Sequence, residues 1–173
     1  MKRLSIICVS LFACFLISSA QKVVVVDIEY ILTNIPQYEA ANDQLNQLSQ
    51  RWQKEIEQAQ AELQTMYQNY QTELVFLTPE MKKQREDEII AKERETNEKK
   101  KEYFGADGKL FKRREILIKP IQDEIYNAIQ DLSNSKKYDI ILDKNSNVGI
   151  VFATPKVDIS DEVLTQLGYS KAE

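Results

Sequence analysis

The chain has 173 residues, a formal net charge of −4, two cysteines and no histidine. Without histidine, and with both cysteines inside the first 20 residues, the usual activated nucleophiles and zinc sites are missing, so we expect neither an enzyme nor a bound metal or cofactor. The acidic balance also argues against nucleic acid as a partner.

The first 20 residues have the parts of a secretory signal peptide. Lys2 and Arg3 form a basic start, residues 4–17 are an apolar run, and residues 18–20 supply small side chains at a cleavage site. The apolar run is short for a membrane span. An alternative is lipoprotein processing at Cys14, where the neighbouring phenylalanine is a poor fit.

Cleavage after residue 20 changes the composition of the chain. Cys8 and Cys14 leave with the signal segment, so the mature chain cannot form disulfides. Lys and Arg fall from 23 to 21 while Asp and Glu remain 27, so the net charge becomes −6.

A short apolar strand opens the mature chain. Residues 22–28 read Lys-Val-Val-Val-Val-Asp-Ile, and four β-branched residues in succession predict a strand that is covered on both faces. Residues 29–34 are expected to form a short helix, which ends before Pro36.

Residues 38–132 are predicted to form two long helices folded back on each other. In the first arm, apolar residues recur every three or four positions, the spacing of a helix that packs along one face. No Gly or Pro interrupts residues 37–78. The apolar positions are Leu45, Leu48, Trp52, Ile56, Ala59, Leu63, Met66, Tyr70, Leu74 and Leu77.

Residues 77–80, Leu-Thr-Pro-Glu, are predicted to form the tip of this hairpin. Thr78 suits the N-cap of a new helix, and Pro79 suits its first position. In the returning arm, 14 of the 20 residues in 82–101 are charged, which indicates a solvated helix that is loosely held to its partner. Two i,i+4 ion pairs are expected in this arm, Glu88–Lys92 and Glu95–Lys99.

The second half of the returning arm is predicted to start after a break. Gly105 and Gly108 lie too close together for an uninterrupted helix and predict a loop or sharp kink. Helix resumes near Lys109 with a stronger apolar face, and Pro120 inside it should bend it.

Two further strands are predicted after the helices, at residues 138–143 and 148–153, joined into a β-hairpin by residues 144–147. The turn partly matches a calcium-binding loop. However, Val148 and Thr154 stand where that loop needs Gly and Glu, so an Asn-rich turn is the better interpretation.

The chain closes with a short predicted helix over residues 161–167. Ser160 is expected to cap its start, and Gly168 to end it.

These elements predict an α+β fold in which a long antiparallel helical hairpin, a coiled-coil-like tentacle, projects from a small β body. We assign residues 21–37 and 133–173 to the body and residues 38–132 to the hairpin. Three short strands bury little surface alone, so we expect the sheet to be completed by trimerisation. The body positions assigned to this interface are Val23, Val24, Val25, Val26, Ile140, Leu142, Ile150 and Phe152.

The order of these segments resembles the Skp/OmpH family of periplasmic chaperones. Residues 22–27 resemble its opening strand, residues 138–144 its second strand, and residues 157–164, Val-Asp-Ile-Ser-Asp-Glu-Val-Leu, its C-terminal ending. The resemblance implies a periplasmic homotrimer whose three tentacles enclose a cavity. That cavity would hold unfolded outer-membrane β-barrel proteins without ATP. Well-studied members are basic, so a net charge of −6 argues against electrostatic capture of clients, lipid or lipopolysaccharide.

A holdase of this kind needs an adaptable apolar surface. Aromatic and methionine side chains outside the helical seam, at Tyr67, Val75, Phe76 and Met81, are the candidate client contacts. Alternatively, Tyr67 and Phe76 pack across the hairpin. The rival function is a structural coiled-coil envelope protein that acts as a spacer or tether. Saturated helix seams would favour the spacer, and a hollow trimer with apolar inner walls would favour the holdase.

Overall fold

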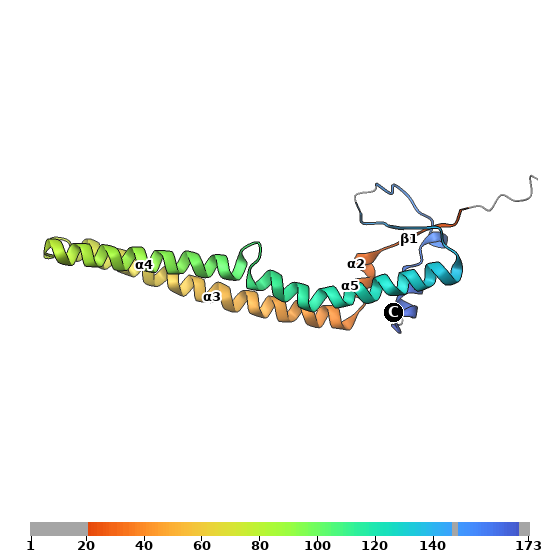
Figure 1. Ribbon diagram of the computed structural model, residues 1–173, viewed down its shortest axis with the longest axis horizontal. Coiled ribbons are helices and arrows are strands. Elements are labelled where there is room, and N and C mark those ends of the chain that lie inside the picture. Colours follow the sequence, from red (N-terminus) through yellow and green to blue (C-terminus); the bar gives the residue numbers. More distant parts are fainter. Residues whose placement is uncertain (1–20, 147–148, 170–173) are drawn as a thin grey trace, which may run out of the picture. The chain divides into compact units, whose positions relative to one another are not determined.

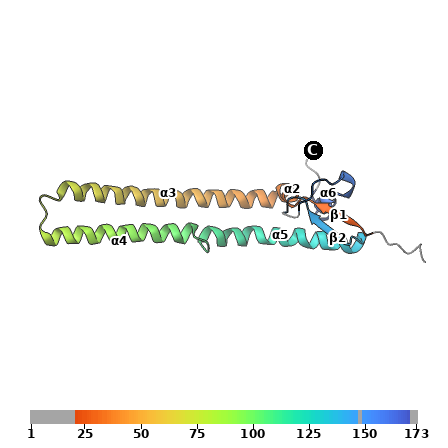
Figure 2. The same ribbon diagram turned by 90° about the horizontal axis from the view of Figure 1, so that it is seen from above.

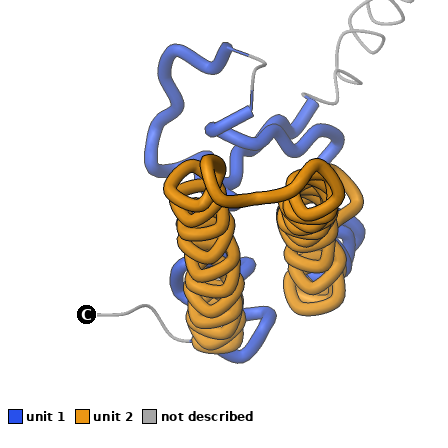
Figure 3. The backbone as a smooth tube through the Cα atoms, turned by 90° about the vertical axis from the view of Figure 1, so that its left-hand side faces the viewer, with its two compact units in different colours: residues 1–34, 125–173 blue, residues 35–124 orange. Residues whose placement is uncertain are grey.

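The computed structural model describes residues 21–146 and 149–169. It divides into two compact units (Figure 3), Ile35–Glu124 and the described parts of Met1–Asn34 with Ile125–Glu173. The predicted signal segment and the alternative processing site at Cys14 lie outside the described residues. Among the described helices, none combines the length and the apolar character needed to cross a membrane.

The unit Ile35–Glu124 contains the predicted helical hairpin. Helix α3 (Pro36–Glu73) has 38 residues, about 57 Å at 1.5 Å per residue, and α4 (Pro79–Phe104) runs antiparallel beside it (Figures 1 and 2). The apolar stripe of α3 faces inward, because Leu45, Ile56 and Ala59 are buried while most of the polar residues between them are exposed. The hairpin prediction is therefore confirmed.

The tip forms as the sequence predicts. The Thr78 hydroxyl accepts a hydrogen bond from the Met81 amide at 3.3 Å, and Pro79 opens α4, where its missing amide hydrogen costs nothing. The glycine break is also present. Helix α4 ends at Phe104, and α5 (Lys109–Lys136), which contains Pro120, begins after the four residues 105–108.

Both glycines of this break are required by close backbone approaches. A Cβ atom at Gly105 would lie 2.4 Å from the carbonyl oxygen of Lys101, and one at Gly108 would lie 2.8 Å from the Gly105 nitrogen. Contacts this short force the backbone to move. The loop between α4 and α5 therefore depends on its two glycines.

One of the two predicted ion pairs within α4 forms. Glu95 contacts Lys99 at 2.9 Å, whereas Lys92 crosses to Glu62 of α3 at 2.6 Å and leaves the predicted pair with Glu88 unmade. The prediction of a Glu88–Lys92 pair was wrong, because spacing along the sequence identifies possible partners only within one helix. The neighbouring arm offers Lys92 a carboxylate at close range.

The other unit is built on two parallel strands. β1 (Val23–Val26) pairs with β2 (Ile140–Asp143) in the register Val23↔Ile140 to Val26↔Asp143. Helix α2 (Ile28–Thr33) follows β1 directly, with the Asp27 side chain accepting a hydrogen bond from the Tyr30 amide at 2.8 Å as its N-cap.

The core of this unit lies between α2 and α6 (Ser160–Gln166). A short 3-10 helix, η1 (Pro155–Val157), precedes α6 in the sequence. Ile31 of α2 and Val163 and Leu164 of α6 are its most completely buried side chains. Gly168 has φ +85° and follows the end of α6, as predicted.

The third predicted strand, at residues 148–153, was wrong. Val148 lies outside the described residues, residues 149–153 form no strand, and the described sheet has two strands that are parallel. Val151 is 99 % exposed and Phe152 is 80 % exposed. The β-branched and aromatic composition was read correctly, but a strand also needs a neighbour with free backbone groups. The described part of the chain places none beside this segment.

Two further expectations about the body need correction. Val24, Val25 and Val26 are already buried within a single chain, so the valine run does not by itself require cover from another chain. Ser160 is the first residue of α6 and not its N-cap, which is Ile159. The Ser160 hydroxyl contacts other parts of the body instead.

The fold predicts a gradient of local stability. α4 buries only Ile89 and Thr96, whereas β1 and β2 pair fully in register. Few buried contacts place a segment at the low-stability end of a protein. Amide hydrogen exchange should therefore be fast over residues 76–101 and slow in β1 and β2. Equal protection of the two regions would contradict this.

Candidate functional site

Large apolar side chains are exposed around the turn that joins α3 to α4. We call Leu74, Val75, Phe76 and Met81 the tip patch. Val75 is 86 % exposed and Phe76 is 85 % exposed, because the turn leaves no opposite arm for them to pack against. The alternative that Phe76 packs across the hairpin was therefore wrong. Tyr67, on α3, is partly exposed.

Polar contacts hold the two arms together near this patch. The Tyr70 hydroxyl donates a hydrogen bond to Glu86, and Arg85 contacts Glu73 at 3.7 Å. The hydrogen bond to Glu86 raises the pKa of the Tyr70 hydroxyl. Further along the arms, the hydrogen bond from Lys92 to Glu62 raises the pKa of that lysine. These polar contacts join the arms without covering the tip patch, so its apolar side chains stay exposed to solvent.

The basic residues beside the tip are partly neutralised. Arg85 contacts Glu73 and also Glu88, at 3.2 Å. Lys82 and Lys83 follow the tip patch in sequence but lie on the same helix as several acids. The site therefore offers apolar surface with little net positive charge.

A second cluster lies where α4 ends, and sequence reasoning missed it. Trp52 of α3 stacks on Tyr103 with ring centroids 5.0 Å apart and meets Phe104 edge-on at 6.5 Å. The Tyr103 hydroxyl donates to Glu55 at 2.7 Å, which raises its pKa. The apolar stripe identified Trp52, but its partners depend on the register between the arms. No local pattern reports that register.

An ion cluster closes the body at the ends of both strands. The Lys144 ammonium contacts Asp158 at 2.7 Å and Asp27 at 3.6 Å. The Ser160 hydroxyl accepts from the Asp27 amide at 2.8 Å and donates to Asp158 at 2.6 Å. We call these four residues the body ion cluster. It ties β1, β2 and α6 together, and the only sequence signal for it was the Asp or Lys at each strand end.

The charges of the cluster support one another. Burial alone would raise the pKa of Asp158, but hydrogen bonds from Lys144 and Ser160 outweigh burial and hold that pKa below its usual value. The hydrogen bond to Asp158 raises the pKa of Lys144. Both groups are therefore charged over the neutral range.

The body also exposes apolar side chains. We call Val23, Ile140, Val151 and Phe152 the body patch, since all four are exposed large apolar residues of this unit. Of the other positions that the sequence assigned to a trimer interface, Leu142 and Ile150 are half-buried. The remaining assigned positions, Val24, Val25 and Val26, lie in the core.

The fold and these surfaces define a class: a protein with a long helical hairpin, a small two-stranded body and exposed apolar patches in both units. The family described as "Outer membrane protein (OmpH-like)" matches residues 22–167. The chain belongs to the OmpH-like family, whose members are chaperones and not enzymes.

The chain is also similar to a curated protein and to a solved structure. The chain is 25 % identical over 150 residues to the chaperone protein Skp of Yersinia enterocolitica, covering 86 % of this chain and 87 % of that protein. The crystal structure of an OmpH-like protein from Caulobacter crescentus matches with a TM-score of 0.67 at 15 % identity, over 86 % of this chain and 85 % of that one. The second match concerns the fold alone. The predicted family resemblance and fold class are confirmed.

The body ion cluster predicts a specific loss of stability. Lys144→Met removes the cation and leaves two partly buried carboxylates unpaired, which should cost about 1–3 kcal/mol in the free energy of unfolding. Lys156→Met is the matched control, because Lys156 is exposed and forms no ion pair with the described part of the chain. Urea unfolding followed by circular dichroism measures both. Equal midpoints for the two variants would refute the role of the cluster.

The same cluster predicts the pH range of stability. The lowered pKa of Asp158 contributes stability above the carboxylate's unfolded pKa of about 3.9, and this is lost as pH falls through the folded pKa. The raised pKa of Lys144 contributes below about pH 10.4 and is lost as pH rises through its folded value. Asp158→Asn should therefore flatten the acid limb of the unfolding midpoint plotted against pH. An unchanged acid limb would contradict this.

Proposed function

We propose that the mature chain is an ATP-independent periplasmic holdase that binds unfolded outer-membrane β-barrel proteins between helical tentacles and prevents their aggregation. The observation that carries the proposal is the tip patch, where Val75 and Phe76 are almost fully exposed on a hairpin of a chaperone family. Exposed apolar surface of this kind is a liability unless it has a partner.

The contacts available to a client are mainly apolar. With the signal segment removed, the chain has a net charge of −6, and Arg85 beside the tip is paired. Charges more than about 8 Å apart are largely screened at physiological salt. Apolar contact contributes about 25 cal/mol per Å², so a few hundred Å² of shared surface contributes several kcal/mol. Several arms acting together would add by raising the effective concentration of contacts.

The proposal includes assembly into a homotrimer through the body. The body patch supports it, because Val151 and Phe152 have β-forming composition, no cover within the described chain and no strand of their own. A strand from another chain beside this segment would provide both cover and hydrogen-bond partners. The division at residues 37/38 and 132/133 between body and tentacle, and cleavage after residue 20, belong to the same proposal.

The rival function is a spacer or tether in the cell envelope. It is favoured by the helix seam, since of the ten apolar stripe positions in the first arm only Leu74 is exposed. The tip patch argues the other way, because a spacer needs no large apolar side chains in solvent at its end. The holdase accounts for both features.

Assembly is tested by charges placed in the body patch. Light scattering should give the mass of three chains for the mature wild type. Val151→Asp combined with Phe152→Asp should give folded monomers, because neither side chain contributes to the single-chain core. Val25→Asp is unsuitable, since Val25 is only 5 % exposed and a buried charge would unfold the body. A folded wild-type monomer at micromolar concentration would overturn the proposed trimer.

Client binding is tested by diluting an unfolded β-barrel protein from urea into the mature protein and following aggregation by light scattering. Wild type should suppress aggregation. Replacing Tyr67, Phe76 and Met81 together by Ser should weaken suppression several-fold and leave assembly intact, because all three are at least partly exposed. The matched control neutralises Lys82, Lys83 and Arg85 to Gln and should do less.

Salt separates apolar from electrostatic capture in this assay. We expect activity at 0.5 M salt to remain close to that at low salt, because apolar contact is not screened. Collapse of activity in high salt, or a larger loss from the charge triple, would establish electrostatic capture instead. Full activity of the apolar triple would remove the tip patch from the proposed function.

A further inference from the structure

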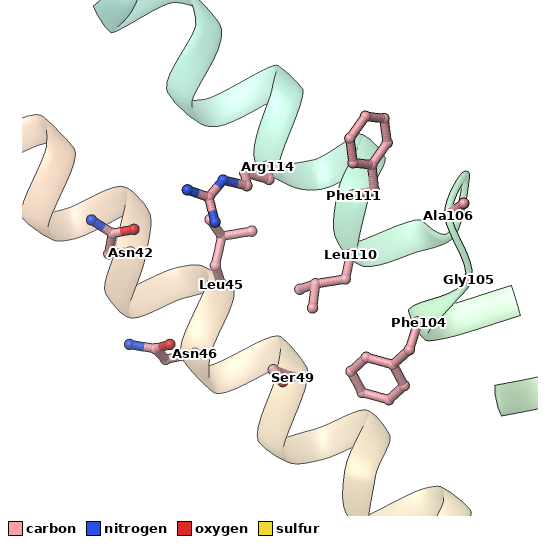
Figure 4. A pocket seen from close by; sticks show the side chains of 10 residues that line it. All are labelled: Asn42, Leu45, Asn46, Ser49, Phe104, Gly105, Ala106, Leu110, Phe111 and Arg114. Atoms are coloured by element: carbon pink, nitrogen blue, oxygen red, sulfur yellow. The ribbon is translucent and has the colours of Figure 1, made fainter. Parts of the chain in front are cut away.

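A cleft of about 410 Å³ lies beside the glycine loop, within the unit Ile35–Glu124. Its floor is apolar. Leu45 of α3 and Leu110 of α5 extend between the two helices, with Phe104 at one end of the row (Figure 4). Its volume is within the range of pockets that bind small ligands. The cleft exists because Gly105 ends α4 and interrupts the arm opposite an unbroken α3.

Polar groups line the same cleft from both sides. Asn42, Asn46 and Ser49 lie on one face of α3 at i, i+4 and i+7, and Arg114 lies at the end of the cleft opposite Phe104 (Figure 4). Within the described residues, none of these four side chains forms a hydrogen bond or ion pair with the protein. The cleft therefore presents unused donors next to an apolar floor.

The charge of the lining is one-sided. Arg114 is the single charged residue that lines the cleft, and no carboxylate of the described chain pairs with it. Elsewhere on the hairpin, Arg85, Lys92, Arg94 and Lys99 contact carboxylates, whereas Arg114 is among the basic side chains that have no carboxylate partner in the described chain. A guanidinium with a free face is complementary to a carboxylate, which it can bind through two parallel hydrogen bonds.

We propose that this cleft binds an aromatic side chain that neighbours a carboxylate in an unfolded polypeptide. The ring lies on Leu45, Leu110 and Phe104, and the carboxylate pairs with Arg114. Asn42 and Asn46 would form hydrogen bonds with the peptide groups between the ring and the carboxylate. The inference rests on the proposed holdase function and deepens it. It adds a preference for client segments in which an aromatic residue neighbours a carboxylate.

The chain contains a built-in reporter for this cleft. Trp52 is its only tryptophan, and its ring makes a T-shaped contact with Phe104, with the ring centroids 6.5 Å apart. A ligand ring placed against Phe104 alters the surroundings of Trp52, so binding can be followed by tryptophan fluorescence. Side-chain amide signals of Asn42 and Asn46 in NMR spectra give an independent reading from the opposite wall.

The first test uses small probes and the intact mature protein. N-acetylphenylalanine, which has both the ring and the carboxylate, should bind saturably with a dissociation constant of about 1 mM, typical of a ligand this small. N-acetylphenylalaninamide lacks the charge, and N-acetylalanine lacks the ring. Each should bind at least about tenfold more weakly, since each loses one of the two contacts.

Two variants and one control assign the binding to the cleft. Arg114→Gln should weaken N-acetylphenylalanine about tenfold and leave the amide probe unchanged. Arg113→Gln is the control, because it removes the same charge from an exposed neighbour that does not line the cleft. Asn46→Phe fills the cleft while keeping Arg114 and should abolish binding. Circular dichroism verifies that each variant is folded.

Two peptides distinguish the possible sources of the carboxylate. One ends in phenylalanine with a free C-terminus, and the other carries an internal Phe-Asp pair with both ends blocked. Binding of either peptide with the same Arg114 dependence supports the inference and identifies the source. Failure of both peptides overturns it for polypeptide clients.

Three results would overturn the inference: no saturable response to N-acetylphenylalanine up to about 10 mM, equal binding of the amide probe, or equal weakening by Arg113→Gln. These measurements contain no client. A cleft that binds its probes in a protein without holdase activity therefore overturns the proposed function alone, and a holdase without probe binding overturns the inference alone.

Discussion

The parallel pairing of β1 with β2 is the constraint on which the rest of the structure depends. The two strands are separated in sequence by residues 27–139, which contain all three long helices. Closing a flexible loop of about a hundred residues costs about 4 kcal/mol, and a two-stranded sheet alone cannot offset that. Two features make the closure possible. The hairpin returns the chain to the body by local helical contacts, and the body ion cluster then fixes the strand ends through Lys144 and Asp158.

This arrangement determines which apolar side chains are buried and which are exposed. In the body, α2 and α6 enclose Ile31, Val163 and Leu164, and the polar groups at the strand ends satisfy one another. In the hairpin, inward-facing residues of α3 are covered, while the turn at the tip leaves Val75 and Phe76 in solvent. A fold that completes its core with so little of its chain can leave apolar groups exposed at defined places. A holdase requires that property.

Much of this could be predicted from sequence because the signals were local. Three-and-four spacing identified α3, Thr78 and Pro79 identified the tip, and the glycine pair identified the break between α4 and α5. Signals that depend on a distant partner failed. Residues 149–153 have the composition of a strand but no strand beside them in the described chain. Lys92 pairs with Glu62 on the other arm and not with the predicted residue of its own helix. The contacts of Trp52 and the cleft near Arg114 depend on the register between arms, which no window of sequence contains.

We propose a division of labour, in which the tip patch contacts clients and the body patch contacts other subunits. Photo-crosslinking from single positions tests it directly, with a photoreactive phenylalanine derivative placed at position 76 or 152, where both native residues are exposed phenylalanines. In the presence of an unfolded β-barrel protein, position 76 should crosslink to the client. Position 152 should crosslink only to another copy of the chain, with or without client. Client crosslinks from position 152, or none from position 76, would contradict the account.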